Sequence, residues 1–190
     1  MKRLFCAVKV PPCEEISEAL GVFRQELQDE AIKWVEPQNL HITLKFFGET
    51  PNRQVGPIVE ALHLAASDCP PGSFRVEGCG TFGSARMPRV IWLGIRRADT
   101  LIGLNTAVNQ RLSPLGYRPD KTLFTPHLTL GRIRELKDHH TLTSVESEFA
   151  DTHFARVDLK AFYLIESFLR PQGPLYKVVH TFVLGEGQRA

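Results

Sequence analysis

The stretch HITLKFFG at residues 41–48 and the stretch HLTLGRIR at residues 127–134 begin with the same pattern of residue types. Each starts with a histidine, continues with an apolar residue and a threonine, and returns to an apolar residue. Successive side chains of a β-strand point to opposite faces, so each histidine shares a face with its threonine while the apolar residues enter the core. The two stretches therefore predict two equivalent strands, each presenting an imidazole beside a hydroxyl.

Helices and strands are mixed along the rest of the chain. Strands are predicted at 3–10, from residue 40, and at 73–80, 89–96, 127–134, 153–166 and 175–184, and helices at 13–31, 51–68, 98–113 and 138–148. Because the order lacks a regular strand–helix–strand repeat, we expect antiparallel pairing in an α+β fold. No linker is long enough to separate two independent domains, so residues 1–190 are expected to form one domain.

The composition is that of an ordinary globular protein, with 43% hydrophobic residues and a formal net charge of +2. So small a charge argues against a protein that coats nucleic acid, and any contact with nucleic acid should be local. The apolar run at 4–8 is too short for a signal peptide or a membrane span. We therefore expect a cytoplasmic protein, and we expect a monomer because no sequence feature asks for a partner subunit.

The residue types that bind metals are present, but their spacing in the sequence does not match a metal-binding motif. The four cysteines, at positions 6, 13, 69 and 79, include no C-x-x-C pair, and we expect them to be buried reduced thiols. The histidines at 63, 139, 140, 153 and 180 form neither an H-E-x-x-H pattern nor a triad with carboxylates. The sequence therefore gives no support for a metal or for another cofactor.

The paired motifs suit acid–base chemistry at a phosphorus atom. Imidazole titrates near neutrality, so one histidine can take a proton from an attacking water while another gives a proton to the leaving oxygen. Threonine hydroxyls can hold the non-bridging oxygens. A single H-x-T pattern is more often a polar strand face than a site, but two copies on two predicted strands are hard to attribute to chance. His41, Thr43, His127 and Thr129 are therefore the predicted site.

A cation follows each motif. Strict alternation places Lys45 on the face of His41, where it could stabilise developing negative charge. The same alternation places Arg132 opposite His127, but Gly131 intervenes, and a glycine near a strand end often marks a bulge that re-aims the next side chain. Arg132 is therefore a candidate on the condition that a bulge is present.

At these residues the sequence resembles the 2H phosphoesterase superfamily, which is named for two H-x-T/S-x motifs. Within it, the similarity is to the bacterial and archaeal RNA 2',3'-cyclic phosphodiesterases, historically called 2'-5' RNA ligases. The resemblance covers nearly the whole chain, including RLFCAVKV, KWVEPQNLHITLKFFGE, PRVIWLGI, PHLTLGRIR and SFLRPQGPLY. It implies two pseudo-symmetric lobes, each an antiparallel sheet with flanking helices, which contribute one motif strand each to a central active-site groove.

The resemblance also implies metal-independent hydrolysis of an RNA 2',3'-cyclic phosphate to a 2'-phosphomonoester. By position in the family, His41 is the proton donor to the departing 3' oxygen, and His127 is the acceptor that activates water. Thr43 and Thr129 would hold phosphate oxygens, and Arg132 matches the arginine that follows the second motif. Members of the family also join or split 2'-5' linkages in RNA without ATP, a reaction with the same geometry.

The expected substrate is a single-stranded RNA end or a tRNA fragment with a cyclic phosphate, because only an unstacked nucleotide can enter a groove. An aromatic side chain that stacks on its base would contribute about 1–3 kcal/mol. Phe46 and Tyr176 are candidates, although alternation places Phe46 opposite Lys45 and so in the core. Three alternatives stay open: an enzyme for small cyclic nucleotides or 2'-5' oligonucleotides, a module that binds RNA ends without turnover, and a metal hydrolase that uses the other histidines.

Overall fold

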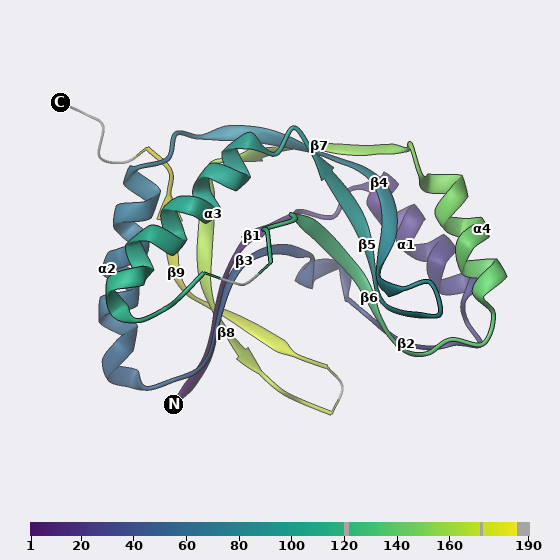
Figure 1. Ribbon diagram of the computed structural model, residues 1–190, viewed down its shortest axis with the longest axis horizontal. Helices are drawn as coiled ribbons and strands as arrows, with labels where there is room; N and C mark the ends of the chain where they lie inside the picture. Colours follow the sequence, from purple (N-terminus) through teal and green to yellow (C-terminus); the bar gives the residue numbers. More distant parts are fainter. Residues whose placement is uncertain (120–121, 172, 186–190) are drawn as a thin grey trace.

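A computed structural model describes residues 1–119, 122–171 and 173–185 and arranges them as two antiparallel sheets with flanking helices (Figure 1). The four-stranded sheet has the order β3-β1-β8-β9, in which β1 is Lys2–Lys9, β3 is His41–Thr50, β8 is Ala161–Phe168 and β9 is Leu175–Val183. The five-stranded sheet has the order β2-β6-β5-β4-β7, in which β2 is Ala31–Trp34, β4 is Gly72–Ser84, β5 is Met87–Arg96, β6 is His127–Glu135 and β7 is His153–Leu159. This arrangement confirms the α+β class.

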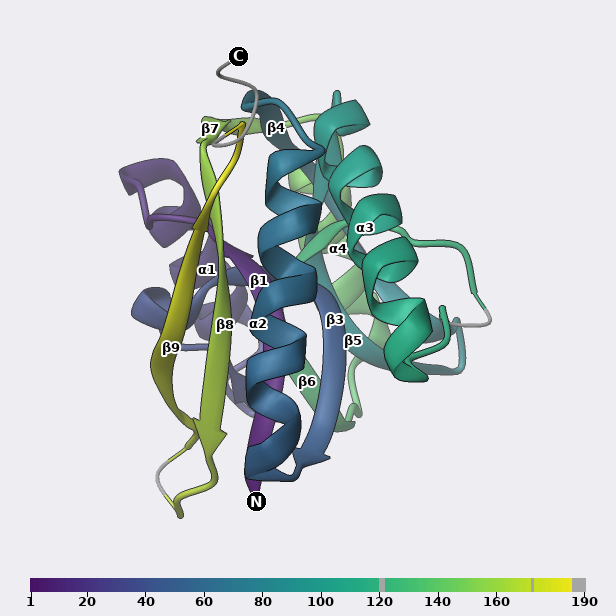
Figure 2. The same ribbon diagram turned by 90° about the vertical axis from the view of Figure 1, so that its left-hand side faces the viewer.

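The helices of the described residues flank the sheets in two pairs. They are α1 (Glu14–Glu26), α2 (Asn52–Ser67), α3 (Asp99–Leu112) and α4 (His139–Phe149), with short 3-10 helices at Pro37–Asn39 and Ser113–Leu115. Helices α2 and α3 lie side by side against the four-stranded sheet, where they contact β9 and β3 (Figure 2). Helices α1 and α4 contact each other and pack on β7 and β4 of the other sheet. A pair of helices therefore flanks each sheet, and α3 also contacts β4 of the five-stranded sheet.

One hydrophobic core runs through both halves of the molecule, joining β1 residues such as Leu4 and Val8 to β5 residues such as Ile91 and Leu93. A second, smaller cluster consists of Phe5, Ala7 and Ile165. Because Phe5 and Ala7 alternate with Leu4 and Val8 along the strand, this cluster lies on the other face of the four-stranded sheet. We call that face, which also carries His41, the groove face.

The strand predicted at 153–166 is two strands, and the prediction of one was wrong. β7 pairs with β4 of the five-stranded sheet, whereas β8 pairs with β1 and β9 of the other. The chain passes from sheet to sheet at Lys160, whose carbonyl accepts a hydrogen bond from Leu184 N–H at 2.9 Å. Strand-like composition continues through this crossing, so the sequence pattern could not reveal it.

Smaller differences concern the first helix and the thiols. α1 ends at Glu26, earlier than the predicted 31, because a turn follows and β2 begins at Ala31 as an edge strand that the sequence pattern did not indicate. All four cysteines are free; Cys6 and Cys69 are buried, while Cys13 and Cys79 are half-buried. Within the described ranges, no helix has the length and apolar character to cross a membrane.

Candidate active site

The two motif strands have the same burial pattern over six residues. At 41–46 in β3 and at 127–132 in β6, the side chains are half-buried, buried, half-buried, buried, buried and exposed. The first four positions alternate as expected, so each histidine and its threonine share the groove side of the strand. The fifth position breaks the alternation in both strands, and it does so at the same place in the motif.

A β-bulge at the fourth motif residue causes this break. In the pairing of β3 with β1, Thr43 opposes Ala7 and Lys45 opposes Cys6, so Leu44 has no partner. In the pairing of β6 with β5, Thr129 opposes Trp92 and Gly131 opposes Ile91, so Leu130 has none. A bulge inserts one residue and reverses the facing of everything after it. The fifth residue of each motif strand therefore turns into the core, and the sixth returns to the groove.

Lys45 is thus not on the face of His41, and the prediction from strict alternation was wrong. Its side chain is 5% exposed, and its Nζ donates a hydrogen bond to the Arg118 carbonyl at 2.6 Å. Its cross-strand partner Cys6 is fully buried, and burial raises the pKa of that thiol to about 12, against the opposing charge of Lys45. The bulge at Leu44 is the physical reason for this placement.

Phe46 takes the position on the groove face that alternation assigned to Lys45. Its ring is 63% exposed and lies 5.8 Å from the ring of Phe5, between centroids. Of the two interpretations that the sequence left open for Phe46, the placement in the core is therefore wrong, for the same reason. Its contact with a substrate base stays a prediction.

Arg132 occupies the equivalent position on β6, and the bulge that its assignment required is present. The bulged residue is Leu130 rather than Gly131. Gly131 has another function: a Cβ there would lie 2.8 Å from the Trp34 ring and 2.9 Å from Ile32 Cγ2 of the neighbouring strand β2. Arg132 is exposed and lies opposite Lys33 of β2, so two cations meet on this side of the sheet.

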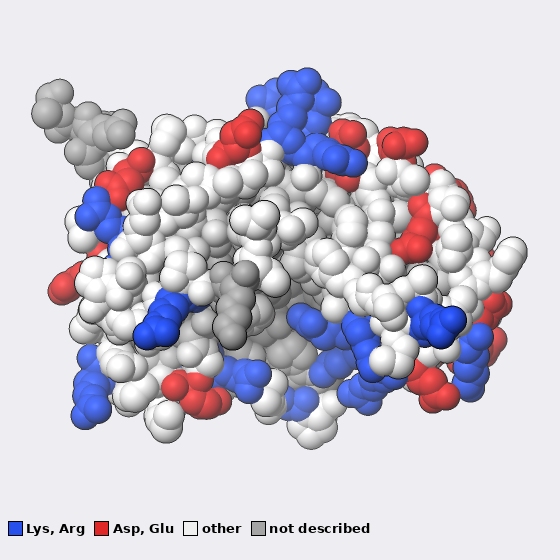
Figure 3. Space-filling model, in the orientation of Figure 1, with Lys and Arg blue, Asp and Glu red and all other residues white. Residues whose placement is uncertain are grey.

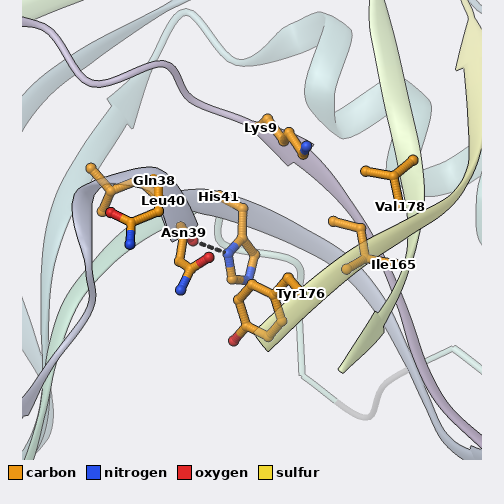
Figure 4. Close-up of a pocket in the computed structure, with 8 residues that line it drawn as sticks. All are labelled: Lys9, Gln38, Asn39, Leu40, His41, Ile165, Tyr176 and Val178. Atoms are coloured by element: carbon orange, nitrogen blue, oxygen red, sulfur yellow. Dashed lines mark hydrogen bonds between the residues drawn. The ribbon is translucent and has the colours of Figure 1, made fainter. Parts of the chain in front are cut away.

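Both imidazoles are anchored in the same way. His41 Nδ1 lies 2.6 Å from the Asn39 carbonyl, drawn in Figure 4, and His127 Nδ1 lies 2.8 Å from the Thr125 carbonyl. A carbonyl oxygen can only accept, so each Nδ1 carries the proton and donates it. Each Nε2 is consequently the atom left to exchange a proton with a substrate.

The surroundings of the imidazoles favour their neutral forms. Burial is the main cause that lowers the pKa of His41 and of His127 below the ordinary value of 6.5, and the carbonyl at each Nδ1 opposes it. The positive charge of Arg132 lowers both pKa values further. Since one guanidinium acts on both rings, β3 and β6 bring the two histidines and Arg132 into one electrostatic neighbourhood.

Aromatic rings pack against each histidine. The Tyr176 ring meets the His41 ring edge-on, with centroids 5.5 Å apart (Figure 4). The Phe5 ring also packs against His41, with centroids 5.1 Å apart. On the other strand, Phe82 of β4 meets His127 edge-on at 4.7 Å. Burial raises the pKa of the Tyr176 hydroxyl, and Arg132 opposes that rise, which places Tyr176 near the same cation. Phe5 and Phe82 carry no local sequence signal, because only the folded sheets bring them to the histidines.

A hollow lies between the two halves of the molecule. A cavity of about 990 Å³ includes Thr43 and Phe46 of β3, His127 of β6 and Phe82, and continues along α3. A smaller pocket of about 50 Å³ is lined by His41 and Tyr176. Figure 3 shows Lys and Arg side chains gathered at one edge of this hollow. Its size is in the range of cavities that hold a nucleotide-sized ligand.

The other histidines lie elsewhere. His63 of α2 and His180 of β9 face each other with their Nε2 atoms 2.8 Å apart, while His139 and His140 are exposed on α4. Among the described residues, no three His, Cys, Asp or Glu side chains gather in a way that could hold a metal ion.

Known proteins share both the sequence pattern and the fold. The sequence profile described as "LigT like Phosphoesterase" matches residues 8–92 and 94–176, so each match contains one motif. The "RNA 2',3'-cyclic phosphodiesterase" of Methanocaldococcus jannaschii is 33% identical over 177 residues, which are 93% of this chain and 98% of the relative. The protein of the same name from Archaeoglobus fulgidus is 34% identical over 181 residues, or 95% of this chain and 99% of the relative.

Solved structures agree. A crystal structure of a protein from Thermus thermophilus is similar with a TM-score of 0.77 and 29% identity, over 96% of this chain and 98% of that one. The crystal structure of E. coli LigT complexed with phosphate has a TM-score of 0.67 and 25% identity, over 96% and 97% of the two chains. With two equivalent motif strands, a shared fold and a profile match along most of its length, this chain belongs to the LigT-like phosphoesterase family.

Proposed function

We propose that this protein hydrolyses the 2',3'-cyclic phosphate at the end of an RNA to a 2'-phosphomonoester. One observation carries the proposal: two equivalent strands each present an imidazole whose Nδ1 is anchored to a carbonyl two residues earlier, which leaves both Nε2 atoms for proton transfer. The printed activity of the relatives from M. jannaschii and A. fulgidus supports the same reaction.

In the proposed reaction, His127 is the general base and His41 the general acid. Nε2 of His127 takes a proton from water as the water oxygen attacks the phosphorus in line with the bond to O3'. That bond breaks, and O3' takes the proton from Nε2 of His41, so the phosphate stays on O2'. The lowered pKa of His127 suits this role, because a base must begin neutral.

The general acid His41 must begin in its protonated form, and the negative charge of the bound substrate can favour that form. Burial lowers the pKa of His41, so its ring is largely neutral at pH 7 before a ligand binds. An opposite charge a few ångströms away favours the charged form of a group. We therefore expect the negative phosphodiester to raise the pKa of His41 on binding and to protonate it where the proton is used.

Three further side chains would act on the phosphate. The hydroxyls of Thr43 and Thr129 share the groove side with the histidines and can donate to the non-bridging oxygens. Arg132 would stabilise the charge that develops on those oxygens in the transition state, where a fixed cation lowers the barrier. Lys45 also lines the larger cavity, but its ammonium donates to the Arg118 carbonyl and it lies on the opposite face of β3 from His41.

The substrate of this reaction would be a single-stranded RNA end or a tRNA fragment. Phe46 and Tyr176, both on the groove face, are the proposed contacts for its terminal base. A 5'-hydroxyl that attacks the phosphorus in place of water would follow the same path, with O3' leaving, and would join two RNA ends through a 2'-5' linkage. We propose that residues 1–190 act as one bilobal unit, as a monomer in the cytoplasm, and without a metal.

The test uses a short RNA that ends in a 2',3'-cyclic phosphate, incubated with the protein in excess EDTA, with the product identified by chromatography against 2'-phosphate and 3'-phosphate standards of the same RNA. A 2'-phosphate is expected from the wild type. Replacing either active-site histidine, His41→Ala or His127→Ala, should lower the rate by roughly 10²–10⁴, the usual share of acid–base catalysis. His139→Ala, on the exposed face of α4, is the matched control and should keep full activity.

Other outcomes point to other functions. Turnover of small cyclic nucleotides or 2'-5' oligonucleotides in preference to the RNA would select that substrate class. RNA binding without turnover, unchanged in both alanine variants, would indicate a binding module. Activity only after metal is restored would overturn the two-histidine mechanism.

A further inference from the structure

The bulged residues of β3 and β6, Leu44 and Leu130, each have a backbone carbonyl that needs a hydrogen-bond donor. A bulged residue has no partner across the strand pair, so its polar groups must be satisfied from elsewhere. The Leu130 carbonyl accepts a hydrogen bond from Val35 N–H at 2.8 Å. The Leu44 carbonyl accepts one from Asn105 Nδ2, also at 2.8 Å. Equivalent carbonyls therefore have donors of different kinds.

Sheet order explains the difference. β6 has β2 on its other side, and the chain just beyond β2 supplies the Val35 N–H. β3 is an edge strand of its sheet, so within the part of the chain that the structure describes no strand lies on that side to donate. Asn105 of α3, which packs against β3, supplies an amide group in its place. The Asn105 side chain thus donates to the bulged carbonyl of the first motif, and the Val35 backbone donates to that of the second.

The Asn105 amide is held in a single orientation. Asn105 is 9% exposed, and its donor Nδ2 points to Leu44. Asn109, one helical turn later, donates from Nδ2 to both the carbonyl and the Oδ1 of Asn105, at 2.9 and 3.2 Å. Because Oδ1 accepts from Asn109, the other end of the amide must face Leu44. A buried donor without a partner costs free energy, so the hydrogen bond to the Leu44 carbonyl favours this orientation of the amide.

We propose that Asn105 is a positioning residue for the first motif: its amide holds the Leu44 bulge next to Thr43, and the bulge directs Phe46 into the groove and Lys45 to the opposite face. The inference rests on the proposed function for its effect on catalysis. Asn105 would act through the backbone of β3, not through the reacting atoms. A loss of alignment of about 1 Å in such a site can cost about 100-fold in rate.

The test compares Asn105→Leu, which keeps the branching at Cγ and removes the donor, with Val108→Ala, which removes packing from a fully buried position of the same helix. Both should lower the melting temperature. Only Asn105→Leu should lower kcat strongly, by about 10- to 100-fold, with a smaller change in KM. Asn105→Asp, similar in shape but without the amide donor, should behave like Asn105→Leu and serves if that variant does not fold.

A second readout does not need turnover. Inorganic phosphate is titrated into isotope-labelled protein, and NMR chemical shifts are followed. The backbone amide shifts of His41 and Thr43 and the imidazole shifts of His41 are compared with the corresponding shifts of His127 and Thr129. The Asn105 variants should alter the response of the first motif and leave that of the second unchanged. Equal responses in both motifs, or kcat within about threefold of that of Val108→Ala, would overturn the positioning role. If the wild type fails to turn over RNA, the proposed function falls, while the titration still decides the role of Asn105.

Discussion

At the scale of single residues, the site is two copies of one arrangement. Each copy has an imidazole with Nδ1 bound to the carbonyl two residues earlier, an aromatic ring against its face or edge, and a threonine on the same side of the strand. The copies differ at the sixth position, where one strand has Phe46 and the other Arg132. At this position one half therefore presents an aromatic ring and the other a guanidinium.

The first prediction concerns pH. The rate kcat/KM should need neutral His127 and protonated His41, and burial, followed by Arg132, lowers the pKa of both rings below 6.5. As pH rises, His41 loses its proton, so the alkaline fall of kcat/KM should begin below pH 6.5. As pH falls further, His127 gains a proton and the rate falls again. An optimum above about pH 7 in kcat/KM would contradict this assignment.

The second prediction concerns Arg132→Ala. Removing a positive charge makes protonation of nearby imidazoles easier, so the pKa values of His41 and His127 should both rise and both limbs of the pH profile should move to higher pH. The rate should also fall, because the charge on the phosphate oxygens loses its partner. Histidine NMR titration measures the pKa values directly. Arg134→Ala, an exposed arginine of the same strand, is the control and should move neither.

At the scale of elements, the bulges determine which side chains of the motif strands face the groove. Each bulge interrupts a two-residue alternation so that positions one, three and six face the groove, while the fifth fills the core. The local sequence predicted the strands and the facing of the first four residues, because alternation depends only on neighbours in the chain. It could not place the bulges, which arise from pairing with β1 and β5.

The third prediction tests the contact of β6 with β2. Gly131→Ala should destabilise the fold, because its Cβ would lie 2.8 Å from the Trp34 ring, and overpacking of this kind costs about 1–3 kcal/mol. Gly21→Ala is the matched control: it lies in α1 with nothing within 4 Å of the added Cβ, and it should stabilise by about 0.5–1 kcal/mol. Urea unfolding measures both. Equal effects of the two substitutions would show that the close contact is not a constraint.

At the scale of the whole molecule, two sheets with separate helix pairs share one core. The core runs from β1 to β5, and the direct passage at Lys160 connects β7 of the five-stranded sheet to β8 of the four-stranded sheet. The groove exists because β3 and β6 come from different sheets and meet in the middle of the molecule (Figure 1). A site divided in this way depends on both halves being folded at once.

The fourth prediction follows from the shared core: unfolding should be one cooperative transition. Trp34 and Trp92 both belong to the five-stranded sheet, so their fluorescence reports that half, whereas far-UV circular dichroism reports the whole chain. The two signals should change at the same urea concentration. Separate midpoints would mean that the halves unfold independently.

The sequence by itself determined the antiparallel α+β class, the two motif strands and the side of the strand on which His41, Thr43, His127 and Thr129 lie. These follow from residue type and from a two-residue period, which act between neighbours in the chain. Only the tertiary structure decided that Lys45 is buried, that Phe46 and Arg132 face the groove, and that Asn105 reaches the Leu44 carbonyl. Each of these depends on a partner far away in the sequence, and only folding brings such partners into contact.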